Sequence, residues 1–435
     1  MHTPTALLEQ RRARAAAAFA TDSEVVLIAA GEPIGVPGGA DQTYPYLAHA
    51  EYFWLTDHEH PGAVLAYDPK EGWTDFVPET TVAERVWEGR GDAPGTPFSK
   101  FEAWFAARQD RRVILLGAGA AGIKHIANDD ARAAELREAL THARRPKDAS
   151  ELDRIRAACA ASAVAYERLR PRLRPGVTER ELQIELEADF FRAGGDRTGY
   201  GTIVAAGSNS AVLHFAPGDR RLNAGDAVLV DAGAEVRRYT SDVTRTWRVA
   251  GGGDPGFFRE LYAIVLGIEE CALAGCKRGT EWRDLHMQAC HGVLSGLREM
   301  GLVKGDPAAL VERDLHALFF PHGLGHLVGL GVRDASGYLP GRVRSTRPGL
   351  NMLRTDLPLE RDYVITVEPG IYFIPALLRD PERRAKYADC VAWDRVDALE
   401  SFGGIRIEDN VRITDGEPEN LTVAIPKSLD SAVLS

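Results

Sequence analysis

The pattern of apolar positions divides the chain into two stretches. Before residue 146, short apolar or β-branched runs bounded by Gly, Pro and Asp predict strands, with helical patterns between and around them. These runs are Val25–Ala30, Tyr52–Thr56, Ala63–Tyr67 and Val113–Leu116. A charged, proline-containing stretch at His142–Ser150 then precedes a long amphipathic segment, Glu151–Leu169, which predicts a helix. We therefore place a domain boundary near Pro146, between a first domain of residues 1–146 and a second of residues 147–435.

The second stretch contains a faint internal repeat. Arg174–Leu182 and Lys277–Leu285 each place a Gly ahead of a short polar turn and a Leu at the start of an apolar stripe. Thr178 and Glu181 also fit a capping box, in which the two side chains satisfy free backbone N–H groups at a helix start. Two explanations stay open: helix starts resemble one another, or the domain is a duplicated pair of halves with a site between them.

Composition narrows the class of protein. The chain has 435 residues, 45% hydrophobic and 26% charged, which excludes disordered and fibrous proteins and fits a large core in two domains. Its net charge of −11 argues against nucleic acid and anionic membranes as partners. The apolar run Ala15–Ala20 is far shorter than the roughly 18 residues that span a bilayer, and we expect an amphipathic helix there. Five cysteines without paired spacing predict a reducing, cytoplasmic location: Cys159, Cys271, Cys276, Cys290 and Cys390.

Three further patterns imitate functional sites. Gly117–Gly122 has the glycine spacing of a dinucleotide-binding loop, but residues 131–142, where the required acidic residue would stand, are helical in pattern. Residues 57–60 (Asp-His-Glu-His) predict a solvated loop, because adjacent side chains diverge. His286 and His291 are five apart and do not share a helix face, so we interpret them as surface or packing histidines. The cysteines are interpreted as small buried apolar residues.

Carboxylates end several buried apolar runs of the second domain. Asp231 ends the run 227–231 and Asp242 lies in the strand-like run 239–247, which together predict a hairpin with one Asp on each arm. A buried Asp is costly unless its charge is paired or coordinates a metal, and two on adjacent strands repel unless a cation lies between them.

The pattern recurs near the C-terminus. Glu368 ends the apolar run 363–368, and Glu408 has β-branched neighbours. Arg406 is two residues from Glu408 on the same predicted face, so we expect its guanidinium to orient that carboxylate. Pro321–His326 contains glycines that permit close backbone approach and present an imidazole. Four carboxylates with one imidazole suit a pair of Mn²⁺, Co²⁺ or Zn²⁺ ions; the alternative is four unrelated buried acids in internal ion pairs.

These residues, in this order, resemble the pita-bread metallopeptidases, and within them the prolidase and Xaa-Pro aminopeptidase branch. The contexts VDAG, SDVTRTW, HGLGH, TVEPGIY and GGIRIED carry the resemblance across the second domain. Residues 51–56 and 61–65 carry a weaker one to the creatinase-type N-terminal domain. The resemblance implies an α+β pita-bread (creatinase/aminopeptidase) catalytic domain preceded by a smaller α/β domain, and a homodimer.

The resemblance also implies roles for single residues. Asp231 binds one metal, His326 and Glu368 bind the other, and Asp242 and Glu408 bridge both. The implied catalytic residues are His214, His322, Glu368, Tyr372 and Arg406. Tyr200 and Ile203 form the wall of the substrate pocket, His322 lines its proline end, and His214 contacts the substrate.

Two arginines bear on specificity. Arg354 matches an arginine that binds the C-terminal carboxylate of a dipeptide in prolidases, a task that suits a guanidinium fork. Arg333 stands where the family has a histidine, and it cannot exchange protons near neutral pH. We interpret Arg333 either as a support for the developing oxyanion or as a second clamp for the carboxylate.

We therefore predict a cytosolic Xaa-Pro dipeptidase with two divalent ions, in which a hydroxide held between the metals attacks the carbonyl before proline. Mn²⁺ is the expected metal, with Co²⁺ or Zn²⁺ as alternatives. Three rivals remain: an aminopeptidase P acting on longer peptides, a promiscuous organophosphate hydrolase, and a non-catalytic binding protein of the same fold.

Overall fold

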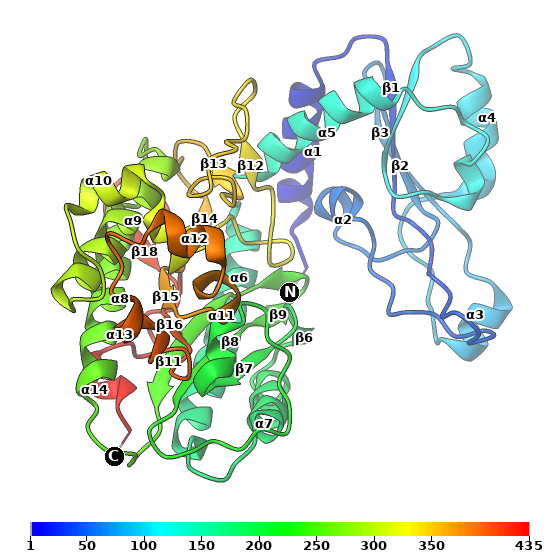
Figure 1. Cartoon of the computed structure of the whole chain (residues 1–435). Helices are drawn as coiled ribbons and strands as arrows, with labels where there is room; N and C mark the ends of the chain where they lie inside the picture. Colours follow the sequence, from blue (N-terminus) through cyan, green and yellow to red (C-terminus); the bar gives the residue numbers. More distant parts are fainter. Residues whose placement is uncertain (1, 435) are drawn as a thin grey trace. The chain divides into compact units, whose positions relative to one another are not determined.

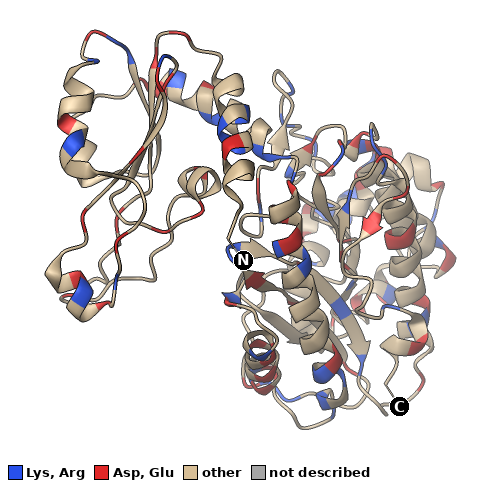
Figure 2. Ribbon diagram, turned by 180° about the vertical axis from the view of Figure 1, so that it is seen from behind, with Lys and Arg blue, Asp and Glu red and all other residues tan. Residues whose placement is uncertain are grey.

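The computed structural model describes residues 2–434 and divides into two compact units, residues 1–144 and 145–435 (Figure 1). The predicted boundary near Pro146 lies beside this division. Acidic and basic residues are interspersed along the ribbons of both units (Figure 2). Within residues 2–434, no helix is both long and apolar enough to cross a membrane.

A five-stranded sheet forms the centre of the first unit, in the order β4-β3-β2-β1-β5. β1 lies between antiparallel β2 and parallel β5, and all of its residues are buried. The helices and strands are α1 (Thr5–Phe19), β1 (Val25–Ala29), α2 (Ala50–Thr56), β2 (Val64–Asp68), β3 (Gly72–Val77), α3 (Val82–Trp87), β4 (Thr96–Pro97), α4 (Phe101–Ala106), β5 (Val113–Gly117) and α5 (Asp130–Arg144). The predicted strands at β1, β2 and β5 and the helix at α1 are confirmed.

Two predictions for the first unit are wrong. Tyr52–Thr56 lies in helix α2 rather than in a strand, and all five of its side chains are buried. Periodicity cannot separate a short helix that is buried all round from a buried strand. Residues 57–60 are not a solvated loop: Asp57 and His60 are buried, and His58 Nε2 lies 2.8 Å from Asp75.

The glycine-rich run after β5 has a structural reason. Gly117 has a φ of +74°, and a Cβ there would overlap the carbonyl oxygen of Ala29 on β1. The run continues into a short 3₁₀ turn, Ala121–Ile123, and residues 131–142 lie in α5 as predicted. Gly117 therefore allows close packing of strands, and the run does not open a phosphate-binding helix.

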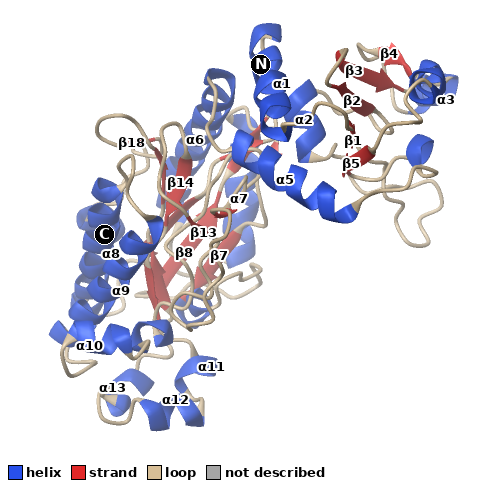
Figure 3. Ribbon diagram, turned by 90° about the horizontal axis from the view of Figure 1, so that it is seen from above, coloured by secondary structure: helices blue, strands red, loops and turns tan. Residues whose placement is uncertain are grey.

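The second unit places its strands between two pairs of helices, α6/α7 and α8/α9 (Figure 3). Its helices are α6 (Ala149–Leu169), α7 (Glu179–Arg192), α8 (Gly256–Gly275), α9 (Trp282–Glu299), α10 (Pro307–Glu312), α11 (Pro375–Leu378), α12 (Pro381–Lys386), α13 (Trp393–Asp397) and α14 (Leu429–Ala432). Its strands are β6 (Arg197–Thr198), β7 (Ile203–Ala206), β8 (Ala227–Ala232), β9 (Ala234–Val236), β10 (Tyr239–Thr240), β11 (Val243–Arg248), β12 (Gly337–Tyr338), β13 (Thr355–Asp356), β14 (Val364–Val367), β15 (Gly370–Tyr372), β16 (Gly404–Arg406), β17 (Asp409–Arg412) and β18 (Glu419–Asn420).

Each helix pair has its own core. α6 and α7 pack on the sheet β11-β8-β7, where Tyr166 and Leu186 meet Val228 and Val230. The α8 and α9 pair packs with β14 to β17. The predicted capping box of Thr178 and Glu181 opens α7, whereas α9 begins without a side-chain cap. The repeat seen in the sequence therefore coincides with two helix pairs on the two sides of the strands.

Candidate metal centre

Two aspartates lie on the sheet β11-β8-β7, which packs against α6 and α7. Asp231 lies near the end of β8, where it faces Thr244 of β11 and Ile203 of β7. Asp242 stands directly before β11, and Asn410 holds its backbone on both sides, accepting from the Asp242 N–H (2.9 Å) and donating to its C=O (2.6 Å). The two aspartates therefore lie at one end of the β8–β11 pair, as the sequence predicted.

Two glutamates and a histidine lie at or beside the strands that pack with α8 and α9. Glu368 follows β14 directly, and Glu408 lies between β16 and β17, bridged to Thr244. His326 lies beside β14, and its backbone N–H donates to the hydroxyl of Thr366 in that strand (3.0 Å). Gly325 permits this approach, because a Cβ there would overlap the Thr366 carbonyl oxygen. The site therefore combines residues from the strands that pack with α6 and α7 and from those that pack with α8 and α9.

The five side chains meet in one place. Carboxylate oxygens of Asp231, Asp242 and Glu408 lie within 4.8 Å of one another. His326 Nε2 lies 3.4 Å from Asp242 Oδ2 and 3.8 Å from Glu368 Oε1. His326 Nδ1 is 3.1 Å from the Leu327 carbonyl oxygen, which leaves Nε2 to face the acids. Oxygen ligands with one imidazole nitrogen form a donor set that fits divalent cations.

The electrostatics of this cluster also fit a cation site. Burial raises the pKa of Asp231, raises that of Glu368 to about 7 and raises that of Glu408 well above its usual range, and repulsion among the acids adds to each shift. Of the four carboxylates, only Asp231 forms an ion pair with an arginine in the described part of the chain. Unrelated acids in separate ion pairs do not account for this arrangement.

Hydrogen bonds from neighbouring side chains orient the acids. Tyr200 donates to Asp231 Oδ1 (2.7 Å), and Thr244 donates to Glu408 Oε2 (2.7 Å). The prediction for Arg406 is wrong in its partner: the guanidinium donates to Asp231 Oδ2 (2.6 Å) and to Thr244 Oγ1 (3.1 Å), and so reaches Glu408 only through Thr244. Glu408 lies between β16 and β17 and belongs to neither strand. The rule that residues two apart in a strand share a face therefore does not apply to Arg406 and Glu408.

A hydrogen-bonded chain of three residues leads away from the acids. Arg406 donates to the Tyr372 hydroxyl (2.9 Å), which lies 2.8 Å from His322 Nε2. Burial and the Arg406 charge lower the pKa of His322 to about 3, so its ring is neutral. His322 Nδ1 then donates to the Gly323 carbonyl (2.9 Å), and Nε2 accepts from Tyr372.

The acids open into a cleft of about 580 Å³ within the second unit. Its lining includes Tyr200, Ile203, His214, His322, Arg333 and Arg354, together with all five candidate ligands. Partial burial, followed by the charge of Arg333, lowers the pKa of His214. Burial and Arg333 also lower the pKa of Arg354. No hydrogen bond or ion pair of either arginine is found among residues 2–434, so both guanidinium groups are open to an anion.

Sequence reasoning missed the supporting residues Thr244 and Asn410. Thr244 follows Asp242 by two positions and so points to the same side of its strand, which is a signal that the spacing contained. Asn410 could not be found this way, because it reaches Asp242 from a strand 168 positions away.

Comparison with known proteins decides the family. The pattern of metallopeptidase family M24 matches residues 153–415, and that of the aminopeptidase P N-terminal domain matches residues 8–106. The chain belongs to metallopeptidase family M24. The resemblance to the Xaa-Pro aminopeptidase and dipeptidase branch and the predicted pita-bread fold are thereby confirmed.

Relatives of this M24 peptidase carry both names of the branch. A probable Xaa-Pro aminopeptidase of Fusarium vanettenii is 30% identical over 416 residues, which cover 91% of this chain and 88% of the relative. The human Xaa-Pro dipeptidase is 36% identical over 285 residues, which cover 64% and 57%. The structure of Pseudomonas aeruginosa aminopeptidase PepP aligns with a TM-score of 0.81 at 26% identity, covering 99% of this chain and 97% of that one. Membership of M24 implies that this peptidase uses divalent metal ions.

Proposed function

We propose that this M24 peptidase is an Xaa-Pro dipeptidase that works with two divalent cations, Mn²⁺ foremost, with Co²⁺ or Zn²⁺ as alternatives. Asp231 would hold one ion, His326 and Glu368 the other, and Asp242 and Glu408 both. When bound, the ions supply an activated water and polarise the scissile carbonyl. The convergence of these five side chains is the observation that supports this part of the proposal.

The chain's own residues supply proton transfer and orientation. Glu368 would move the proton of the attacking water, as the resemblance implies. Burial raises its pKa to about 7 in the metal-free protein, and a bound cation lowers it again. His322 Nδ1 lies 3.7 Å from Glu368 Oε2. His322 is the last residue of the hydrogen-bonded series that runs from Arg406 through Tyr372. His214 and Arg333, on the cleft wall, would support the oxyanion that develops on the carbonyl.

The two open arginines favour a dipeptide over a longer peptide. A dipeptide has its carboxylate on the proline itself, so a cation close to the metal centre can bind it. Arg354 and Arg333 line the same cleft as the ligands and are close enough for Arg333 to lower the pKa of Arg354. The two like charges repel each other, the Glu368 carboxylate opposes this only in part at Arg354, and a substrate carboxylate between the guanidinium groups would remove the repulsion. Their free guanidinium groups carry the dipeptidase assignment.

Substrate-length kinetics test the assignment. Arg354→Gln should raise KM for Ala-Pro by roughly 10- to 100-fold, the effect of losing charged hydrogen bonds of about 1.5 to 3 kcal/mol, and leave Ala-Pro-Ala less affected. Arg298→Gln, at an exposed position of α9, is the control and should match wild type. Equal losses on both substrates would contradict a carboxylate-binding role.

An Xaa-Pro aminopeptidase that cleaves longer peptides is the second candidate. The name of the F. vanettenii relative, which matches over most of its length, favours it. Faster cleavage of Ala-Pro-Ala than of Ala-Pro by the wild-type enzyme would decide for this candidate. A homodimer in the cytosol completes the proposal, and analytical ultracentrifugation of the purified chain tests the dimer.

A further inference from the structure

A second cluster of metal-binding side chains lies in the core behind the catalytic cleft. It consists of His286 and Cys290 of α9 and His316 of a 3₁₀ turn at Leu315–Leu318, all at most 1% exposed. One candidate ligand atom from each lies within 4.8 Å of the other two. None of the three lines the catalytic cleft. The cluster is therefore separate from the carboxylate centre.

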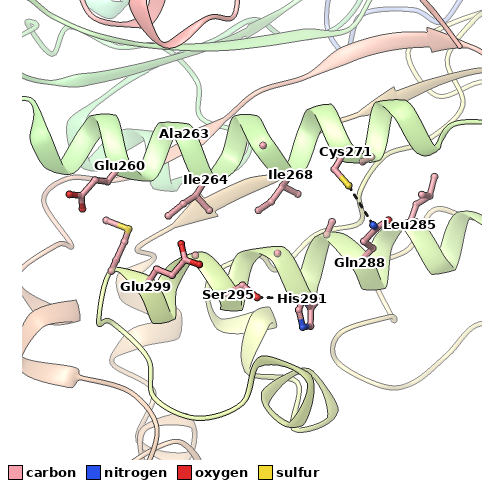
Figure 4. A pocket seen from close by; sticks show the side chains of 16 residues that line it. Glu260, Ala263, Ile264, Ile268, Cys271, Leu285, Gln288, His291, Ser295 and Glu299 are labelled. Carbon is pink, nitrogen blue, oxygen red and sulfur yellow. Dashed lines mark hydrogen bonds between the residues drawn. The ribbon is translucent and has the colours of Figure 1, made fainter. Parts of the chain in front are cut away.

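The spacing of the two α9 histidines did not indicate this cluster, because the residue that shares a helix face with His286 is Cys290 and not His291. His286 and Cys290 are four apart and share the buried face of α9. His291 lies instead on the open side of α9, in a surface groove of about 770 Å³ between α8 and α9, where its Nδ1 is 3.4 Å from Ser295 Oγ (Figure 4). Four of the five cysteines are buried as expected, whereas Cys271 is exposed in that groove.

The polar atoms of the cluster lack partners. In the described chain, neither ring nitrogen of His316 has a hydrogen-bond partner, and neither does His286 Nδ1. His286 Nε2 donates to the Gly349 carbonyl oxygen (2.8 Å), so the lone pair of the neutral ring lies on the unpartnered Nδ1, and Cys290 Sγ lies 3.4 Å from the same ring at Nε2. Buried polar groups in proteins are nearly always paired, so an imidazole with two unpaired nitrogens requires an explanation.

The surroundings keep the imidazoles ready to bind a metal. Burial lowers the pKa of both His286 and His316 to about 4, so each ring is neutral and has a free lone pair. Asp314 beside the cluster is paired with Arg347 (2.6 Å). Gly349 leaves room for His316, because a Cβ there would overlap His316 Nε2.

We propose that His286, Cys290 and His316 bind one cation of the Zn²⁺ type, at a site distinct from the carboxylate centre. In a tetrahedral zinc site with Zn–S of about 2.3 Å and Zn–N of about 2.0 Å, sulfur and nitrogen ligands lie roughly 3.5 Å apart. The candidate ligand atoms of the three residues lie within 4.8 Å of one another, so one ion can contact all three. Two nitrogens and a sulfur select Zn²⁺ or Co²⁺ over Mn²⁺. Binding converts the thiol to a thiolate and releases one proton to solvent.

An ion at this site would clamp α9 to the segment that leads to the catalytic histidines. The rings of His286 and Phe320 are 5.7 Å apart, and those of Phe320 and His322 are 4.8 Å apart. The same segment continues to His326. The cation therefore stabilises the wall that carries both histidines and takes no part in the chemistry.

Cobalt spectroscopy on the full-length, metal-free protein tests this proposal. A thiolate bound to Co²⁺ gives a charge-transfer absorption that a carboxylate and imidazole centre cannot give. We expect this band with one equivalent per chain, its loss in Cys290→Ser and His316→Gln, and its retention in Cys271→Ser. Asp242→Asn should also retain it, which separates this site from the proposed catalytic centre. Absence of the band in wild type, or its persistence in Cys290→Ser, would overturn the proposal.

A second measurement covers the case in which the core variants do not fold. X-ray absorption of the Zn²⁺-loaded wild-type and Cys271→Ser proteins should show the same sulfur scatterer at about 2.3 Å. Zinc with only nitrogen and oxygen neighbours in Cys271→Ser would refute the site.

Discussion

In the metal-free protein, the free energy of unfolding should fall as the pH rises. Deprotonation of Glu368 should account for much of that fall. Burial raises the pKa of Glu368 from 4.5 to about 7. A raised carboxyl pKa means that the folded protein holds this proton more tightly than the unfolded chain does. The stability from the neutral carboxyl is complete below about pH 4.5 and is lost as the pH rises through about 7.

The size of the effect follows from the shift. A difference of about 2.5 pKa units at about 1.36 kcal/mol each gives about 3 kcal/mol of unfolding free energy. Burial is the largest cause, and the His326 and Arg406 charges oppose it. Substitution by glutamine keeps the shape of the protonated side chain without the charge, so metal-free Glu368→Gln should lack this pH-dependent loss.

Urea unfolding of chelator-treated protein at about pH 5 and pH 8 measures this difference. We expect the loss between the two pH values to be about 2.5 kcal/mol smaller in Glu368→Gln than in wild type, because a small part of the full effect is already lost at about pH 5. Glu299→Gln, at an exposed position of α9, is the control and should behave as wild type. Addition of Mn²⁺ to wild type at about pH 8 should restore stability. Equal pH-dependent losses in wild type and Glu368→Gln would show that the Glu368 carboxyl is not the source of the loss.

Three further predictions concern the groups around the acids. Thr244→Val removes the hydroxyl between Arg406 and Glu408, so metal affinity measured by isothermal titration should fall by roughly 10- to 100-fold, and an unchanged affinity would contradict that role. Gly325→Ala forces a Cβ onto a carbonyl oxygen, so the melting temperature should fall and metal content should drop; a normal melting temperature would contradict the packing. Tyr372→Phe breaks the link to His322 and should lower kcat more than it raises KM, whereas a change in KM alone would contradict it.

Local pattern predicted most of the strands and the positions of the candidate ligands, whereas the pita-bread fold was predicted from the family resemblance that the ligand motifs carry. Strands such as β8 and β14 are continuous apolar runs, and a carboxylate at the end of each stands out against them. The helix α2 was missed because the run of five residues, Tyr52–Thr56, is too short to have a period that separates helix from strand.

What the sequence could not supply are partners that come together only through the fold. Arg406 binds Asp231, 175 positions away, rather than the Glu408 two positions away. His316 lies far along the chain from the two α9 residues that it joins, so no spacing rule finds it. Local pattern therefore located the acids, whereas tertiary packing decided what orients them.

The most direct test of the proposed centre is proline release from Ala-Pro by the chelator-treated protein before and after addition of Mn²⁺, in wild type and Asp242→Asn. We expect no release without metal, release by wild type once Mn²⁺ is added, and a loss of at least about 10³-fold in a folded Asp242→Asn variant, because this carboxylate is proposed to hold both ions. Metal-independent proline release, or an Asp242→Asn variant as active as wild type, would contradict the proposed centre.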